Sequence, residues 1–482
     1  MIVSIVIVAI LVVKAVLFFT AKPKVIVNYV AEYNRITRPV NYDPNDNAAT
    51  YYQKAFDAFV ELPKELQEVP YIIGWVTDFN NTERTLLEKW LVSNTLAFYY
   101  FKIAANKPYY WLERHAGKDN NMMSMNLHES FLLRQLIYAL TWDAKLAASK
   151  GRLETAFENI IDCYKAGRQK CLTPSLLTEQ KVGLEIKLDA AYGTMVILDR
   201  AQLDSTSLKS FNDALQTEFN NDTYVLDFAA DKLFCYDVLQ RTFVDNSKGT
   251  GRLYWKEAER FPGSTLTFGC YGRWYNLWYE WDGPWYNACP FLYGPTKKET
   301  IAQIEQLLKL FEPLKTQTPW QIHKQGYYLE KIEEICNNNF FLRMVAPSPR
   351  REFSLYHLVK AKTEALIAIA AILRFKEDNH QFPVSLDELV SNGYLESVPM
   401  DPYSDGPLVY KLTGDNFKLY SVGEDFVDDD GATNVRTDGA TRRDILFWPI
   451  RRLDDIRKKS EKQKAEREAK ARKEIEEANQ PE

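Results

Sequence analysis

The feature that most restricts how this chain can fold is a helix without a polar side. Residues 355–379 have helical periodicity, and all nine positions from Ala365 to Leu373 are apolar. A helix that is apolar around its whole circumference must be buried on more than one face, and this run is too short to cross a bilayer. We therefore predict that the helix packs against several neighbouring elements.

The residues after this helix predict a small antiparallel sheet. Ser385 and Glu388 have the capping-box spacing that begins a short helix. Apolar residues then alternate along 408–412 and 417–419, and the intervening Thr-Gly-Asp-Asn supplies turn chemistry for a β-hairpin. We predict a mainly α protein that ends, over 351–450, in a small α+β unit with a helix packed on antiparallel hairpins.

The chain becomes very acidic beyond the second predicted strand. Crowded carboxylates repel one another unless they are solvated or neutralised by a cation, and calcium accepts about six to eight oxygen ligands from a flexible loop. An EF-hand is excluded, because placing Gly431 at the sixth loop position puts Phe426 first and Thr437 last. A solvated acidic loop and a calcium site both remain open on composition alone.

Residues 361–448 resemble the globular head of the major pseudopilin of type II secretion systems. The resemblance rests on a D-P-x-x-x-G-P-x-x-Y element that begins at Asp401 and an L-Y-S-x-G-x-D element from Leu419 to Asp425. A third motif places Asp444 and Ile445 just before aromatic residues. The resemblance implies a helix packed on a small sheet.

In that family the loop between the last two motifs binds calcium. The resemblance therefore implies Asp425 and Asp444 as side-chain ligands and Val422 as a backbone carbonyl ligand. Asp428 and Asp430 are added as candidate ligands because of the local density of carboxylates. Calcium is the one cofactor that we expect.

The chain departs from the pseudopilin pattern at its beginning. A pseudopilin has a short basic leader and a processing site directly before an apolar helix, and that helix leads straight into the head. Here no such site precedes the apolar stretch, which lies more than 300 residues before the head-like region. We expect the fold and the cation site to carry over, but not assembly into a filament.

The first 21 residues predict a transmembrane anchor. They are apolar except for Ser4, Lys14 and Thr20, and about 20 apolar residues are needed to cross a bilayer. A cleaved signal peptide or a buried element are the alternatives. Lys22 and Lys24 follow the stretch, and the positive-inside rule would put the bulk in the cytoplasm.

The pseudopilin-like region argues for the opposite topology. Pseudopilin heads work outside the cytoplasm, where calcium is abundant enough to fill modest sites. We therefore expect a single-pass protein of the cell membrane with its bulk in the periplasm or outside the cell, acting as a binding or scaffold protein. Membrane is the one partner that we expect, because the sequence identifies no protein partner.

Helical patterns dominate residues 47–220. We expect an irregular α-helical domain there, preceded by a connector over 22–46, with single helices over 82–103 and 129–149. A break at Gly151 is typical of one tetratricopeptide-like hairpin, but no further copies recur at a fixed period. A repeat array is therefore the weaker interpretation.

Two further segments complete the predicted organisation. Residues 221–350 combine an aromatic-rich segment with helices, and a boundary is expected near 345–355, where Asn, Pro and Ser cluster. Residues 451–482 place Glu three or four positions from Lys or Arg, which predicts a charged tail that is either a solvated helix or disordered.

The aromatic segment supplies an alternative function. Within 268–293, tryptophans could form a stacking platform for sugar rings, as in a cell-surface polysaccharide-binding protein or glycoside hydrolase. Packing in a junction and contact with a membrane are the other interpretations. Glu280 and Asp282 are candidate polar partners, but a spacing of two does not establish the distance that hydrolysis requires, so no catalytic residue is assigned. The platform residues are Trp274, Trp278, Trp281 and Trp285.

Charge and cysteine content exclude other classes. The net charge is −5 and the basic residues are dispersed, which argues against nucleic-acid binding. The six cysteines include no CxxC pair, which argues against a zinc site built on sulfur. Cys270 and Cys289 could form a disulfide, and buried free thiols are an equally good interpretation.

Overall fold

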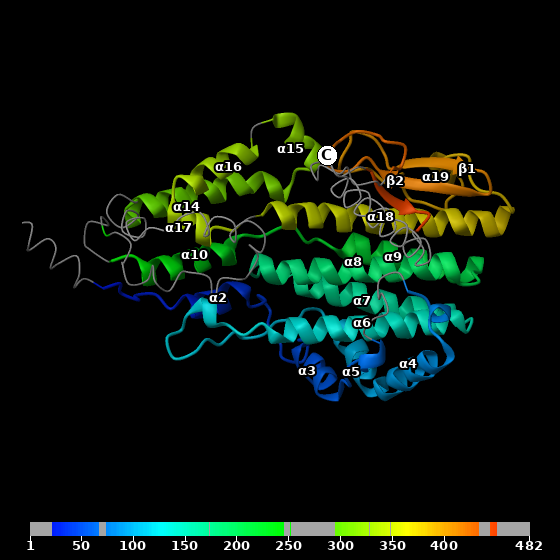
Figure 1. Cartoon of the computed structure of the whole chain (residues 1–482), viewed down its shortest axis with the longest axis horizontal. Helices are drawn as coiled ribbons and strands as arrows, with labels where there is room; N and C mark the ends of the chain where they lie inside the picture. The colour runs from blue at the N-terminus through cyan, green and yellow to red at the C-terminus, as the bar shows by residue number, and fades with distance from the viewer. Residues whose placement is uncertain are drawn as a thin grey trace, which may run out of the picture.

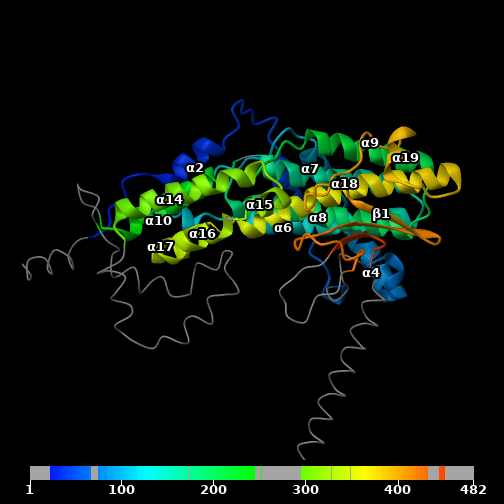
Figure 2. The ribbon, with the colours of Figure 1, turned by 90° about the horizontal axis from the view of Figure 1, so that it is seen from above.

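The computed structural model confirms the mainly helical class and the small antiparallel sheet (Figure 1). Long helices lie side by side along the longest axis of the molecule, and the sheet covers one end of the outermost long helix (Figures 1 and 2). Structure is described for residues 22–66, 74–172, 174–244, 251, 295–326, 328–347, 349–432 and 444–450.

Three antiparallel helices form the centre of the molecule: α6 (His128–Ser149), α7 (Leu153–Leu172) and α8 (Leu177–Arg200). The backbones of α7 and α8 cross closely, because a Cβ atom added to Gly183 would lie 2.8 Å from the carbonyl oxygen of Gly167. Only glycine permits this approach, since real Cβ atoms do not come so near a backbone oxygen.

A lower layer of shorter helices covers α6: α3 (Ala49–Ala58), α4 (Asn81–Ser93) and α5 (Thr95–Ala105). The single helix expected over 82–103 is wrong, because Asn94 interrupts it. The buried Asn94 amide donates to the carbonyls of Trp90 and Val60, and its oxygen accepts from the Val60 N–H at 2.9 Å. Asparagine side chains compete with the helical ladder in this way.

The apolar helix predicted from the sequence is α18 (Arg350–Asn379), and it is buried on several faces as expected. One side packs against α8 and α9 (Ser205–Asn221), and the other side carries the sheet. Every residue from Ala365 to Leu373 is buried. The hydrophobic core therefore runs without interruption from the helical bundle into the α+β unit.

The sheet contains β1 (Val409–Thr413), β2 (Asn416–Ser421) and β3 (Ile445–Trp448) in that order, all antiparallel. The predicted hairpin is confirmed, with Thr413 paired to Asn416 at the turn. Gly414 has a φ of +60° there, which suits glycine. The short helix α19 (Leu386–Ser391) is capped by Ser385, as the capping-box spacing predicts.

The opposite end of the molecule contains α2 (Tyr29–Thr37), α10 (Ala229–Thr242) and α14 (Lys297–Phe311). The region expected to be only a connector, 22–46, therefore holds a helix. The remaining short helices are α15 (Pro319–Gln325), α16 (Tyr328–Asn337), α17 (Phe340–Val345), η1 (Lys64–Leu66), η2 (Val76–Asp78), η3 (Met122–Ser124) and η4 (Glu312–Lys315).

A second hydrophobic core lies at this end. It joins Phe228, Leu239 and Phe311 to Phe341 and to Phe353 in the first turns of α18. Because the later turns of α18 belong to the first core, this one helix connects the two. The predicted boundary near 345–355 therefore coincides with the start of α18. The first turns of this helix still pack into the second core, so the core continues across the predicted boundary.

Two expectations from the sequence concern residues without a described structure. The predicted anchor over 1–21 and the charged tail over 451–482 lie outside the described ranges. Within those ranges, no helix is long and apolar enough to cross a bilayer. Cys163, Cys171 and Cys235 are buried free thiols and Cys336 is a half-buried one, whereas Cys270 and Cys289 are not described.

One charged residue is buried where α18 meets α8. The Lys362 ammonium lies 3.6 Å from the ring centroid of Tyr192 and 3.9 Å from the sulfur of Met195. Burial lowers the pKa of Lys362 from 10.5 to about 7. The unfolded chain consequently binds more protons than the folded chain between these values, and stability rises with pH in this window.

Lys362→Met should remove this pH dependence. We expect the variant to be more stable than the parent at pH 6 to 7. The difference in their free energies of unfolding should shrink toward pH 10 by up to about 1.4 kcal/mol per pH unit. Melting temperatures of the full chain in detergent, recorded across this range, provide the measurement. The exposed Lys360→Met is the matched control. A difference in melting temperature between Lys362→Met and the parent that does not change with pH would contradict the role assigned to burial.

Candidate functional site

The candidate calcium loop follows β2 and returns to the sheet at β3. Asp444 stands at the return point and is buried. Its carboxylate accepts N–H groups from Asp429, at 3.1 Å, and from Gly431, at 2.6 Å. Burial raises the pKa of Asp444. The two hydrogen bonds lower it by less, and the nearby carboxylates raise it further. Asp444 therefore closes the loop through the backbone.

Asp428 and Asp430 are more exposed and face the outer side of the sheet. Lys411 on β1 contacts Asp430 at 2.8 Å and Asp428 at 3.8 Å. Lys418 on β2 contacts Asp430 at 3.6 Å, and the Tyr420 hydroxyl donates to Asp428 at 2.8 Å. The strands thus supply two lysines that neutralise part of the acidic loop.

The remaining predicted ligands lie at the start of the loop. The Asp425 carboxylate accepts the Val427 N–H at 3.3 Å, in a local turn. The Val422 N–H donates to Asp401 at 2.9 Å. Among the residues that the structure describes, no group of three or more His, Cys, Asp or Glu side chains is arranged to hold a metal ion. Residues 433–443, which complete the loop, are outside the described ranges.

Asp401 has a structural role that the sequence motif did not reveal. Its buried carboxylate accepts the Tyr403 N–H at 2.9 Å, the Ser421 hydroxyl at 2.8 Å and the Val422 N–H. It therefore joins the turn that begins the D-P motif to the end of β2, where the acidic loop starts. Burial raises the pKa of Asp401, although the three hydrogen bonds act to lower it.

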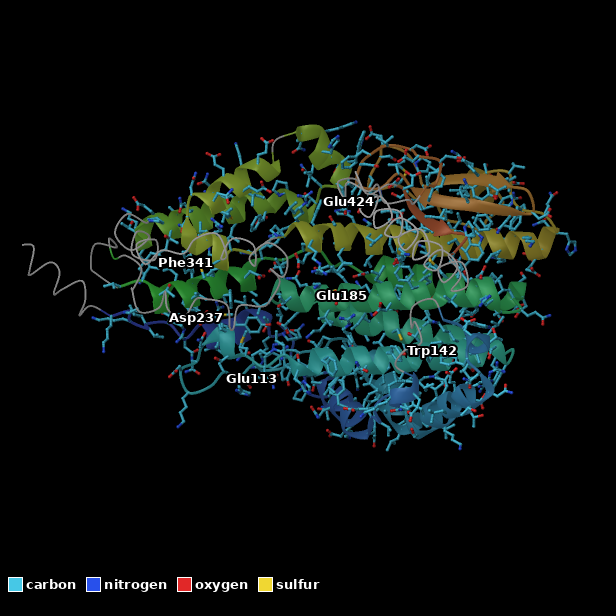
Figure 3. All side chains as sticks on the ribbon, in the orientation of Figure 1. Glu113, Trp142, Glu185, Asp237, Phe341 and Glu424 are labelled. Atoms are coloured by element: carbon cyan, nitrogen blue, oxygen red, sulfur yellow. The ribbon has the colours of Figure 1, made fainter. Side chains whose placement is uncertain are left out.

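Helix α15 holds the same loop from the helical side. The ring of Phe426, which has a φ of +61°, stacks on His323 with centroids 4.1 Å apart. The Trp320 backbone N–H donates to the Pro402 carbonyl, and Lys324 pairs with Asp405. Glu424, labelled in Figure 3, marks the position of this loop near α15 and the sheet. The acidic loop is thereby fixed at both of its described ends.

The predicted sugar-binding platform is not described. Trp274, Trp278, Trp281 and Trp285, with Glu280 and Asp282, fall within residues 252–294, outside the described ranges. The sugar-binding alternative therefore stays a prediction based on the sequence pattern.

The structure also contains a buried ionic cluster that sequence reasoning missed. The Glu179 carboxylate on α8 accepts hydrogen bonds from Arg114 and from the Tyr33 hydroxyl of α2, and it pairs with Lys170 of α7 at 3.2 Å. Glu129 on α6 contacts Arg114 at 2.6 Å and Lys170 at 3.6 Å. Four helices and the segment before α6 are thus joined by compensated charges.

Electrostatics explains why this cluster stays ionised. Burial of Glu179 raises its pKa, but Lys170 and Arg114 outweigh that effect and bring the pKa to about 2. Its stabilising contribution is therefore present above the ordinary value of 4.5 and is lost as the pH falls toward 2. The Asn34 side chain reinforces the attachment of α2 by bonding both the N–H and the carbonyl of Arg114.

A small cavity borders this ionic cluster. Its lining includes Tyr110, Ser175, Arg114, Lys170 and Glu179, and its volume of about 20 Å³ accommodates one water molecule. Among the described residues, the hydroxyls of Tyr110 and Ser175 lack a hydrogen-bond partner. The cavity is too small for a metabolite. The hydrogen bond from Tyr33 to Glu179 attaches α2 to the bundle.

Comparison of the chain with models of protein families, with curated proteins and with solved structures returned no match. The resemblance to pseudopilin heads is consequently supported by the motifs alone.

Glu179→Gln should destabilise the protein and release α2. Removing one partner of a buried ionic group leaves the Arg114 and Lys170 charges undercompensated, at a cost of about 3–5 kcal/mol. We expect a lower melting temperature at pH 7 and faster tryptic cleavage after Arg35, both measured on the full chain.

Glu185→Gln provides the matched control on the same helix (Figure 3). Glu185 pairs with Arg134 at 3.0 Å and with Lys181 at 3.5 Å at a partly exposed site, where such pairs contribute less than about 1 kcal/mol. Equal melting temperatures for the two variants would refute the assigned role of Glu179.

Proposed function

We propose that the protein is a membrane-anchored, extracytoplasmic binding or scaffold protein. Residues 1–21 supply the anchor, and a pseudopilin-like α+β unit stabilised by calcium is presented at the end of α18. The unit does not itself polymerise. The apolar composition of residues 1–21 and the motifs of residues 361–448 support these assignments.

The burial of α18 is the observation that carries the scaffold proposal. A filament built from pseudopilin-like heads needs a free helix for packing between subunits. Here α18 is covered by α8 and α9 on one side and by β2 and β3 on the other. Ala365, Ile369 and Ile372 are each fully buried, so the helix already has all of its packing partners within one chain.

We expect the purified full chain in detergent to form discrete particles, with or without calcium, because α18 is already covered within the chain. Negative-stain electron microscopy and sedimentation velocity provide the measurement. Filaments that grow with protein concentration would overturn the scaffold proposal, because they would require α18 or the sheet to become available to a neighbouring copy.

Calcium should raise the melting temperature of the full chain. The proposed ligands are Asp425, Asp444 and the Val422 carbonyl, with Asp428 and Asp430 available once calcium displaces Lys411. Oxygen ligands of this kind suit calcium at about 10⁻⁴–10⁻³ M in extracellular modules. Thermal melts across a calcium titration in this range give the measurement.

Asp425→Asn combined with Asp444→Asn should abolish this shift. Asp415→Asn, in the exposed hairpin turn, is the matched control and should retain it. The absence of any calcium-dependent shift in the parent chain would eliminate calcium and leave a loop neutralised by Lys411 and Lys418.

A further inference from the structure

The chain is fixed to the body almost as soon as it leaves the predicted anchor. The side-chain oxygen of Gln240 on α10 accepts the N–H groups of Ile26, at 3.0 Å, and Val27, at 3.1 Å. The Gln240 amide donates to the Val27 carbonyl at 2.8 Å. We call these three hydrogen bonds the Gln240 clamp.

The Gln240 clamp is itself held in place. The fully buried Asp237 accepts the Gln240 amide at 3.0 Å, Arg241 at 2.9 Å and the Met122 N–H at 2.8 Å. Immediately after the clamp, α2 begins and its Val30 side chain is buried. The chain therefore has no free linker beyond residue 25.

Chain geometry then limits the distance between the body and the bilayer. Ile26 lies five positions after residue 21, the last of the apolar stretch, and an extended chain spans at most about 3.5 Å per residue. The Gln240 clamp thus lies within roughly 17 Å of the hydrocarbon edge. The headgroup region occupies about 6 Å of that distance.

The surface around the Gln240 clamp suits phospholipid headgroups. Lys22, Lys24 and Lys298 are exposed there, and the side chains of Val25 and Ile26 are 54% and 70% exposed. The first turn of α14 reaches this end because the Lys297 N–H donates to the Gly251 carbonyl, next to Val244 at the end of α10. Lysines near a membrane surface are attracted to anionic lipids by about 1 kcal/mol each.

The two ends of the long axis carry different elements. Residues 22–28 leave the body at the end that carries α10 and α14, whereas α19 and the sheet lie at the other end (Figures 1 and 2). Asp237 in Figure 3 marks the end nearest the N-terminal segment. End-on attachment would therefore present the α+β unit away from the membrane.

We propose, on the basis of the anchor proposed above, that residues 22–27 with the adjoining ends of α10 and α14 form a membrane-docking face. The Gln240 clamp holds this face end-on against an anionic bilayer, so that the body is oriented and does not swing on a tether.

Energy transfer to a headgroup-labelled lipid tests the orientation. The full chain, with Cys270, Cys289 and Cys336 changed to Ser, is reconstituted into vesicles of phosphatidylcholine and phosphatidylglycerol. A dye is attached at the exposed Ala302→Cys on α14 or, as the distant control on α19, at Asp387→Cys. We expect transfer to be severalfold stronger from position 302. Equal transfer from both positions would overturn end-on docking.

Gln240→Ala tests the clamp in the same vesicles. Removing the clamp hydrogen bonds should speed tryptic cleavage after Lys24 by about tenfold, because proteolysis follows the population of the opened segment. Gln216→Ala on α9, whose side chain donates to the nearby Asn220, is the matched control. Val27→Pro removes one clamp donor without changing α10 and should also speed cleavage.

The outcomes separate this inference from the anchor. Cleavage of Gln240→Ala and Val27→Pro at the rate of Gln216→Ala would refute the clamp while the anchor stood. Release of the parent chain from vesicles by alkaline carbonate would refute the anchor and the docking face with it. Retention of the parent chain, with fast cleavage of both clamp variants, supports the docking face.

Discussion

The arrangement of the end that carries α2 and α10 depends on the charge of Glu179. Its carboxylate lies where α2, α7, α8 and the Arg114 segment meet, and it compensates two buried cations. Buried charges are costly singly and tolerable only together, so these segments are stable in one mutual arrangement. Once α2 is fixed through Tyr33, the residues before it come within reach of Gln240. The ionic cluster therefore positions α2, and α2 in turn places the preceding residues at the Gln240 clamp.

Patterns that are local in the sequence predicted the C-terminal fold well. The uniform apolarity of residues 365–373 indicated a helix with neighbours on several sides, and alternation across a turn indicated the β1–β2 hairpin. The missed features have little local signal. Asn94 is one polar residue within an apolar helical pattern, and its effect depends on Val60, 34 positions away. Helix α2 is short, and much of its stability comes from contacts with distant segments.

In the candidate sites too, features with a local sequence signal were predicted and features that depend on distant residues were missed. The motifs located the acidic loop and named Asp401, but only the paired strands reveal that Lys411 and Lys418 reach the acidic residues. No spacing rule could have found the Glu179 cluster, because Tyr33 and Glu179 are 146 positions apart. Calcium binding stays a prediction, since the loop is closed by residues 433–443, which are not described.

Helix α18 gives the body the mechanical character of a strut. With 30 residues it is about 45 Å long, and its first turns lie in one hydrophobic core while its later turns lie in another. Bending it would require one core to separate from its neighbours. A load applied at one end would thus pass along hydrogen-bonded backbone to the other with little loss. Helix α18 thereby keeps the two hydrophobic cores at a fixed distance from each other.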